Sequence, residues 1–263
     1  MYSSELKKRS LYYYKTGFEE SLNELSKIAS EVSVYTEKIQ ENGYNAEKFG
    51  VPEIIDASNN LIEGVKGEAE SMKVLWDQIK LCQTTFENFM KSKWLETKPY
   101  DMEEDVKKLQ KVAKDIKCDR KCNAYVGLMQ DIKNWLIFLP LIAELRDEAM
   151  RERHWIALKK AIAKEFNLDD KLTLRDIFNL NLGQQSETVE EITDQAKQEA
   201  RMEKTLNKLE EIYSLVEFEL QQHKQTDVYM LKMKDEDFEA LEENYVSVNA
   251  MFSSRFLSTF EEE

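Results

Sequence analysis

The feature that most limits how this chain folds is its shortage of glycine and proline. Its 263 residues include seven glycines and three prolines, whereas an average protein has several times more of both. β-Sandwiches, β-barrels and TIM barrels need many turns, and turns draw on these two residues. A loop that cradles a phosphate also needs glycine in special backbone conformations. The composition therefore predicts long helices with few connections, and it leaves little room for a nucleotide site.

Charge and hydropathy restrict the possible partners. The chain has 37 Lys and Arg residues against 51 Asp and Glu residues, a net charge of −14. Nucleic acids and anionic membranes attract proteins with an excess of basic residues, so this balance argues against both. The longest unbroken apolar run, 135–143, is about half of the roughly 18 residues that a membrane span needs. Residues 1–15 contain no apolar secretory segment. We therefore expect a protein that binds neither nucleic acid nor membrane. The odd number of cysteines, three, in a chain without a secretory signal predicts reduced thiols in an intracellular, cytoplasmic protein.

The usual signatures of catalysis and cofactor binding are missing from the sequence. It contains no P-loop, no dinucleotide-binding glycine motif, no His-Glu-x-x-His and no Glu-x-x-His. Cys118 and Cys122 are spaced as metal ligands can be, but the nearest histidine, His154, is isolated. Adjacent carboxylates are numerous, and in so acidic a chain they are typical of solvated helix faces. We expect no catalytic, nucleotide-binding or metal site.

The apolar periodicity predicts a mainly α fold. Apolar residues at spacings of three and four predict helices, and alternation predicts short strands. The expected helices are 10–42, 53–95, 102–116, 124–146, 151–166, 173–178 and 187–222, and the expected strands are 226–233 and 245–251. Together they predict an elongated bundle of long antiparallel helices with a small β-hairpin-like element near the C-terminus. We divide the chain into segments 1–98, 99–183 and 184–263.

The few helix-breaking residues mark the expected boundaries. Gly43 is predicted to end the first helix, and Asp101 with Glu104 resembles a capping box for the third. Pro140 lies inside the fourth helix and predicts a kink or break near Leu139. Pro140 and Gly183 are therefore the expected kink and hinge positions.

One segment is distinctive in chemistry. Residues 139–145 read Leu-Pro-Leu-Ile-Ala-Glu-Leu, and residues 149–155 read Ala-Met-Arg-Glu-Arg-His-Trp. Taken alone, this pattern predicts an apolar helix, a kink, and a second amphipathic helix that buries Trp155 and holds His154 in a hydrogen bond. We expect Arg151, Arg153, His154 and Trp155 to be structural anchors of that helix.

This order of motifs resembles the linker region of dynein heavy chains, the segment N-terminal to the AAA+ motor ring. Similar motifs follow in register from Trp76 to Phe256, among them 123–128 (Asn-Ala-Tyr-Val-Gly-Leu) and 191–199 (Glu-Ile-Thr-Asp-Gln-Ala-Lys-Gln-Glu). The forms of 123–128 and 151–155 are more similar to axonemal than to cytoplasmic heavy chains, and most similar to the outer-arm type. Residues 1–72 match least, and they belong either to the linker or to the neck before it.

The resemblance implies a mechanical function. The chain would be a fragment of a much larger microtubule motor ATPase, and it would couple ATP-driven changes in the AAA+ ring to movement of the tail. ATP and Mg would be bound by the parent chain's AAA+ modules, and the fragment itself would hold no cofactor. Its partners would be those ring modules, with the Arg151–Arg153 pair as a possible contact, the tail of the same heavy chain, and other dynein subunits. The location would be the ciliary or flagellar axoneme.

Two other functions stay open from the residues alone. A generic α-helical scaffold or tethering protein would use the same seams of apolar residues as coiled-coil-like interaction faces. A small all-α enzyme is the third possibility.

Overall fold

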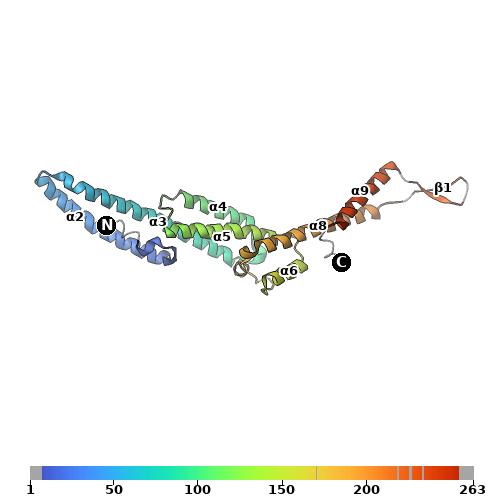
Figure 1. The fold of residues 1–263 in the computed structure, drawn as a ribbon, viewed down its shortest axis with the longest axis horizontal. Coiled ribbons are helices and arrows are strands. Elements are labelled where there is room, and N and C mark those ends of the chain that lie inside the picture. The colour runs from blue at the N-terminus through green and yellow to red at the C-terminus, as the bar shows by residue number, and fades with distance from the viewer. Residues whose placement is uncertain (1–7, 170, 218, 225–226, 233, 255–263) are drawn as a thin grey trace. The chain divides into compact units, whose positions relative to one another are not determined.

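The computed structural model describes residues 8–169, 171–217, 219–224, 227–232 and 234–254. Most of these residues are helical, and one two-stranded antiparallel sheet lies near the C-terminus (Figure 1). This arrangement confirms the prediction of a mainly α fold with a small β element.

The chain divides into two compact units. Unit 1 is the chain up to Ala143 together with Asn167–Gly183, and unit 2 is Glu144–Phe166 together with the chain from Gln184 onward. The chain therefore passes between the units three times: inside a helix after Ala143, in a loop after Phe166, and in a 3-10 turn after Gly183. The three-segment division made from the sequence stays a prediction.

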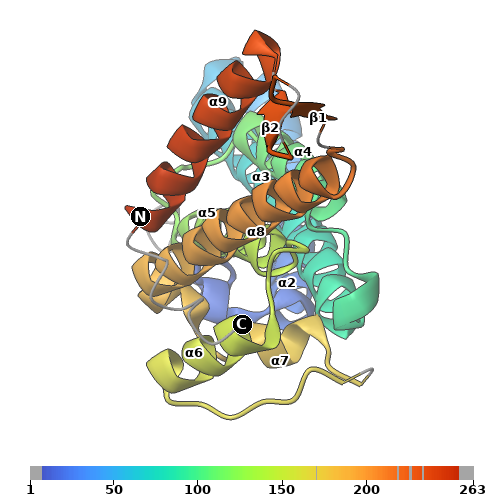
Figure 2. The ribbon, with the colours of Figure 1, turned by 90° about the vertical axis from the view of Figure 1, so that its right-hand side faces the viewer.

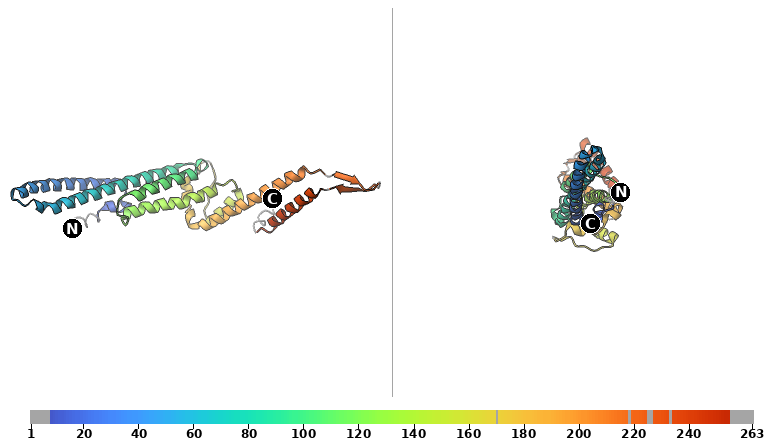
Figure 3. Two further views of the ribbon diagram at one scale, coloured as in Figure 1. Left: turned by 90° about the horizontal axis from the view of Figure 1, so that it is seen from above. Right: turned by 90° about the vertical axis from the view of Figure 1, so that its left-hand side faces the viewer.

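Two long helices form most of the N-terminal part of unit 1. α2 (Phe18–Lys48) and α3 (Asp56–Lys91) are joined by the 3-10 turn η3 (Pro52–Ile55), and they run side by side as a hairpin (Figure 3). The prediction that Gly43 ends the first helix is wrong. Gly43 is buried inside α2, and a Cβ at this position would lie 2.9 Å from Cδ1 of Ile55. This glycine allows close packing, while Gly50, with a φ of +72°, makes the turn.

The next helix begins earlier than expected. α4 (Pro99–Asp115) has Pro99 in its first turn, and its N-cap is Lys98. The proposed capping box of Asp101 and Glu104 is therefore wrong, because both residues lie inside the helix. Proline favours this position since its fixed φ suits the helix and its missing N–H would have no partner there.

The central helix of unit 1 continues through its proline. α5 (Asn123–Leu145) contains Pro140, so of the kink or break expected near Leu139 the break does not occur, and the kink stays a prediction. Pro140 is exposed, whereas Leu139 and Ile142 beside it are fully buried. Burial of these neighbours offsets the one backbone hydrogen bond that proline cannot make. By length and composition alone α5 would also be able to cross a membrane, but within unit 1 its apolar side chains form a protein core.

Tyr14, near the N-terminus, packs closely against α5 and forms two hydrogen bonds with it. The backbone N–H of Tyr14 donates to Oδ1 of Asn123 at 2.9 Å, and its hydroxyl donates to Oδ2 of Asp131 at 2.5 Å. Gly127 lies between them, and a Cβ there would come within 2.2 Å of Cγ of Tyr14. Asn123, Gly127 and Asp131 are spaced by four, so one face of α5 receives the tyrosine ring. The glycine of the 123–128 motif is thus required by packing.

A short helix completes unit 1. α7 (Leu174–Phe178) has the capping box formed by Thr173 and Asp176, and it matches the predicted helix 173–178. Two backbone hydrogen bonds tie the chain before α7 to the end of α3, from Trp94 N–H to Leu172 O and from Leu174 N–H to Ser92 O. This places α7 against α3, with Phe178 stacked on Trp135 of α5.

Unit 2 consists of α6 (Glu152–Ile162), α8 (Ser186–Ser214), the hairpin β1 (Glu219–Gln222) and β2 (Tyr229–Lys232), and α9 (Asp235–Phe252). α6 and α8 contact each other (Figure 2). α6 ends earlier than predicted because Ala163 adopts a left-handed conformation with φ of +52°.

The β element forms from different residues than expected. The strand at 226–233 is confirmed at Tyr229–Lys232, but its partner is Glu219–Gln222, which we assigned to the end of a helix. The predicted strand 245–251 is wrong, because these residues belong to α9. Three acidic residues at its N-terminus (Asp235, Glu236 and Asp237) favour this helix. The series of resembling motifs reaches Phe256, which lies outside the described residues.

Candidate functional site

The four residues singled out from the sequence lie at the start of α6. Arg151 is the N-cap residue, with an extended backbone (φ −97°, ψ 169°), and its N–H donates to Nδ1 of His154 at 3.0 Å. This contact is one half of a capping box, with histidine in the place that Glu or Gln usually takes. Since Nδ1 accepts a hydrogen bond, the ring proton of the neutral imidazole is at Nε2.

A buried carboxylate on α8 binds the other side of the imidazole. Nε2 of His154 donates to Oε2 of Glu199 at 2.7 Å, and Nε of Arg153 donates to the same oxygen at 2.8 Å. The second oxygen, Oε1, accepts from Nε2 of Gln195 at 2.8 Å. The Glu199 side chain is only 1% exposed. Its carboxylate therefore accepts hydrogen bonds from the side chains of Arg153, His154 and Gln195 in place of water, and the arginine carries a full charge.

A second ion pair lies at the surface beside the first. Arg151 and Glu203 approach to 3.2 Å, and both side chains are about half exposed. Exposed pairs contribute about 0–1 kcal/mol, whereas a buried carboxylate depends strongly on its partner. The Arg153–Glu199 pair is therefore the energetic centre of the cluster, and the Arg151–Glu203 pair is a minor addition.

Trp155 lies inside the unit rather than on its surface. It is 8% exposed, and its ring meets Phe166 edge to face with centroids 6.1 Å apart. Leu158 and Ile162 continue the same buried face of α6, and Val189 and Ala196 are buried on α8. The expectation that His154 is hydrogen-bonded and Trp155 is buried is confirmed.

The hydrogen bonds of this cluster join α6 to α8 within unit 2. Both nitrogens of His154 take part in hydrogen bonds, and Glu199 accepts from three side chains. The role of these residues as structural anchors stays a prediction. Among the described residues no group of three His, Cys, Asp or Glu side chains is arranged to hold a metal ion. An open cleft of about 500 Å³ borders the cluster, and it is lined by Arg151, Glu152, Arg153, Ile156 and Glu203.

The sequence analysis missed Glu199 and Glu203 as the partners of the two arginines. A signal for Glu199 was present, since Val189, Thr193, Ala196 and Glu199 follow a spacing of three and four along the buried face of α8. A carboxylate on such a face requires a partner. Nothing in the sequence, however, says that this partner lies on α6.

The two expected hinge positions both belong to unit 1. Pro140 lies in α5 one turn before the crossing into unit 2, and Gly183 in the 3-10 turn η5 (Leu182–Gln185) is the last residue of unit 1. Each therefore lies close to a point where the chain passes between the units. Their role as hinges stays a prediction.

Comparisons with known proteins agree with the resemblance found in the sequence. Residues 62–263 match the family model for the dynein heavy chain, N-terminal region 2. The whole chain is 33% identical to the dynein alpha chain of the flagellar outer arm from Chlamydomonas reinhardtii. It is 34% identical over 82% of its length to the ciliary dynein beta chain of Tripneustes gratilla, and 31% identical over 92% to human dynein axonemal heavy chain 17.

These relatives are far longer than the chain. It spans 6% of the algal protein and 5% of the sea urchin and human proteins. All three are named as ciliary, axonemal or flagellar, and one as a chain of the outer arm. The relatives are thus of the axonemal type that the motifs resemble, and they include an outer-arm chain. The chain belongs to the dynein heavy chain family.

Proposed function

We propose that this chain is part of the mechanical linker of an axonemal dynein heavy chain. In this function it transmits changes in the parent chain's AAA+ ring to the tail, and the tail then moves along microtubules. The match of residues 62–263 to the N-terminal region of the family is the observation that carries the proposal. The axonemal relatives support a location in the ciliary or flagellar cytoskeleton.

The secondary structure suits a part that transmits force. A lever needs long helices packed along each other, because an isolated helix bends easily. Unit 1 supplies such a set in α2, α3 and α5. Of the three connections between the units, the one after Ala143 lies within a regular helix. We infer that α5 carries one of these connections, and that bending is confined to positions near Pro140 and Gly183.

The function places nucleotide chemistry elsewhere in the parent chain. We propose that ATP and Mg are bound by the AAA+ modules of that chain, and that this segment neither binds nor hydrolyses nucleotide. Its partners are then the ring modules and the tail of the same chain, together with other subunits of the assembled motor.

A scaffold or tether built on coiled-coil-like faces is the competing function. Exposed apolar residues on α8, among them Leu206, Ile212 and Tyr213, favour it. The two functions differ in what the purified chain does by itself. A scaffold assembles through these faces, whereas a linker segment stays monomeric.

Two measurements on the 263-residue chain test the proposal. Light scattering at increasing concentration is expected to give the mass of a monomer, and a stable oligomer would favour the scaffold. An ATPase assay is expected to give no turnover above the buffer, and specific, saturable hydrolysis would overturn the absence of a nucleotide site.

A further inference from the structure

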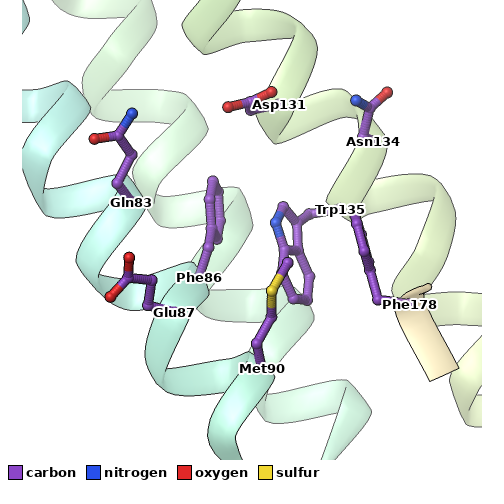
Figure 4. Close-up of a pocket in the computed structure, with 8 residues that line it drawn as sticks. All are labelled: Gln83, Phe86, Glu87, Met90, Asp131, Asn134, Trp135 and Phe178. Atoms are coloured by element: carbon purple, nitrogen blue, oxygen red, sulfur yellow. The ribbon is translucent and has the colours of Figure 1, made fainter. Parts of the chain in front are cut away.

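A cleft in unit 1 has features that neither a lever nor a core requires. It lies between α3 and α5, next to the end of α7, and has a volume of about 500 Å³ (Figure 4). It is lined by Gln83, Phe86, Glu87, Met90, Asp131, Asn134, Trp135 and Phe178. The lining thus combines an aromatic wall with two carboxylates, two amides and a thioether.

The aromatic wall is rigid. Trp135 lies between two stacked rings, with centroids 5.1 Å from Phe86 and 5.5 Å from Phe178. Phe89 and Phe138 meet the same indole edge-on at 5.7 Å. Since aromatic pairs contribute about 0.5–1.5 kcal/mol each beyond the area they bury, four such contacts fix the indole in one orientation. The wall is therefore formed before any ligand arrives.

The indole retains one unused polar group. Trp135 is 97% buried, being 3% exposed, yet its Nε1–H donates to no acceptor among the described residues, although the indole lines the cleft. Nε1 is not among the buried polar atoms without a partner, so its N–H is open to the cleft. It can donate to water or to a carbonyl or similar oxygen of a ligand that enters the cleft.

The charged groups of the cleft have one sign. Glu87 is exposed on α3 and forms no ion pair or hydrogen bond with the described residues. Asp131 on α5 accepts from the hydroxyl of Tyr14 and keeps further lone pairs for a second donor. No Lys or Arg is among the lining residues. The cleft therefore attracts a cation.

We propose that this cleft binds the side chain of an arginine presented by a partner protein. The guanidinium pairs with Glu87 and is further stabilised by Asp131, and its methylene stem packs against the aromatic side chains of the cleft. The carbonyl of the partner's backbone accepts from Nε1–H of Trp135. Arginine fits better than lysine because it is planar, weakly hydrated and able to bind a carboxylate through two parallel hydrogen bonds. This inference does not depend on the mechanical function of the chain.

The test uses the full chain and three short peptides. Acetyl-Gly-Arg-Gly-amide is titrated into the ¹⁵N-labelled protein to about 10 mM, a range that detects millimolar binding. In the second peptide citrulline replaces arginine, which removes the charge and keeps the planar shape. In the third peptide lysine replaces arginine, which keeps the charge and removes the planar guanidinium. The reporter is the indole N–H resonance of Trp135, which a Trp135→Phe variant assigns.

The expected result is a saturable shift of that resonance with the arginine peptide. Binding should weaken about tenfold with the citrulline peptide and about tenfold in Glu87→Gln, since each change removes one charge-assisted hydrogen bond. Glu87 is exposed, so its variant should fold normally. Glu37→Gln removes an equal charge from an exposed position on α2 and should leave binding unchanged.

Three results would overturn the proposal. The first is an indole resonance that does not move at the highest concentration of arginine peptide. The second is equal binding of the citrulline peptide, which would mean that charge is not recognised. The third is equal binding of the lysine peptide, which would mean that the cleft recognises any cation and not arginine in particular.

Discussion

Removing the Glu199 carboxylate is expected to destabilise the packing of α6 on α8 more than removing one partner of a surface ion pair would. Glu199 is 1% exposed and accepts from Arg153, His154 and Gln195. In Glu199→Ala all three donors lose their acceptor at once. His154 is itself 97% buried, and its Nε2–H would be left without a partner.

The size of the effect follows from how far water can replace the lost contacts. Breaking a buried ion pair costs about 3–5 kcal/mol, and an unsatisfied buried donor costs about 1–3 kcal/mol. Arg153 is 31% exposed, so its guanidinium regains part of its hydration. The expected cost for Glu199→Ala is therefore about 3 kcal/mol, at the lower end of the range for buried pairs. Glu199→Gln should cost less, because the amide fills the same space and still offers one acceptor.

Hydrogen exchange of the α6 backbone amides measures this cost where it arises. A loss of 3 kcal/mol corresponds to an increase of about 100-fold in exchange through opening. Glu203→Gln is the matched control, since it removes the exposed partner of Arg151 and should change exchange by less than about threefold. If Glu199→Ala changed exchange no more than Glu203→Gln does, the buried pair would not be the energetic centre of this cluster.

Three further predictions concern unit 1. Gly127→Ala should destabilise the chain by about 1–3 kcal/mol in urea unfolding, because its Cβ would overlap the ring of Tyr14. Gly64→Ala, whose Cβ meets nothing, should be stabilising by up to about 1 kcal/mol, and equal effects of the two would refute the packing argument. Ser21→Ala should be neutral or stabilising by up to about 1 kcal/mol in the same assay, since the Ser21 hydroxyl is buried without a partner; a clear loss would show that the hydroxyl is bonded. Burial, with hydrogen bonds to Glu68 and Asp131 respectively, raises the pKa of Tyr12 and Tyr14 above the ordinary value of about 10. Their contribution to stability is therefore present below pH 10 and lost at higher pH, and absorbance at 295 nm should show them ionising after the exposed tyrosines rather than with them.

The features that the sequence predicted well are those set by local patterns. Apolar spacing located α3, α5 and α8 to within a few residues at most ends, and the 173–178 helix matched α7 closely. The prolines and glycines were harder to interpret. Gly43 lies inside α2 instead of ending it, and α5 continues through Pro140 without a break, because packing around both residues outweighs their local preference. Local rules give the free energy by which a residue destabilises a helix, and only the tertiary contacts decide whether that destabilisation is offset.

The features that the sequence did not predict depend on partners distant in the chain. The alternation at 245–251 suggested a strand, but the segment that pairs with Tyr229–Lys232 is the one directly before it. In the same way, Arg153 and His154 were identified as anchors, while Glu199, 45 residues from His154, was not named as the group that holds them. The cleft beside Trp135 draws its lining from α3, α5 and α7, so no single stretch of sequence contains it.

The most direct test of the proposed function softens α5 where it passes between the units. In the full-length heavy chain, Gly-Gly-Ser is inserted after Ala143, and the matched control carries the same insertion after Arg120, in the loop between α4 and α5 within unit 1. Microtubule gliding velocity and ATPase turnover are then measured together. We expect the Ala143 insertion to slow gliding strongly while ATP turnover continues, and the Arg120 insertion to change neither. Unchanged gliding in the Ala143 variant would contradict a force-transmitting role for this segment.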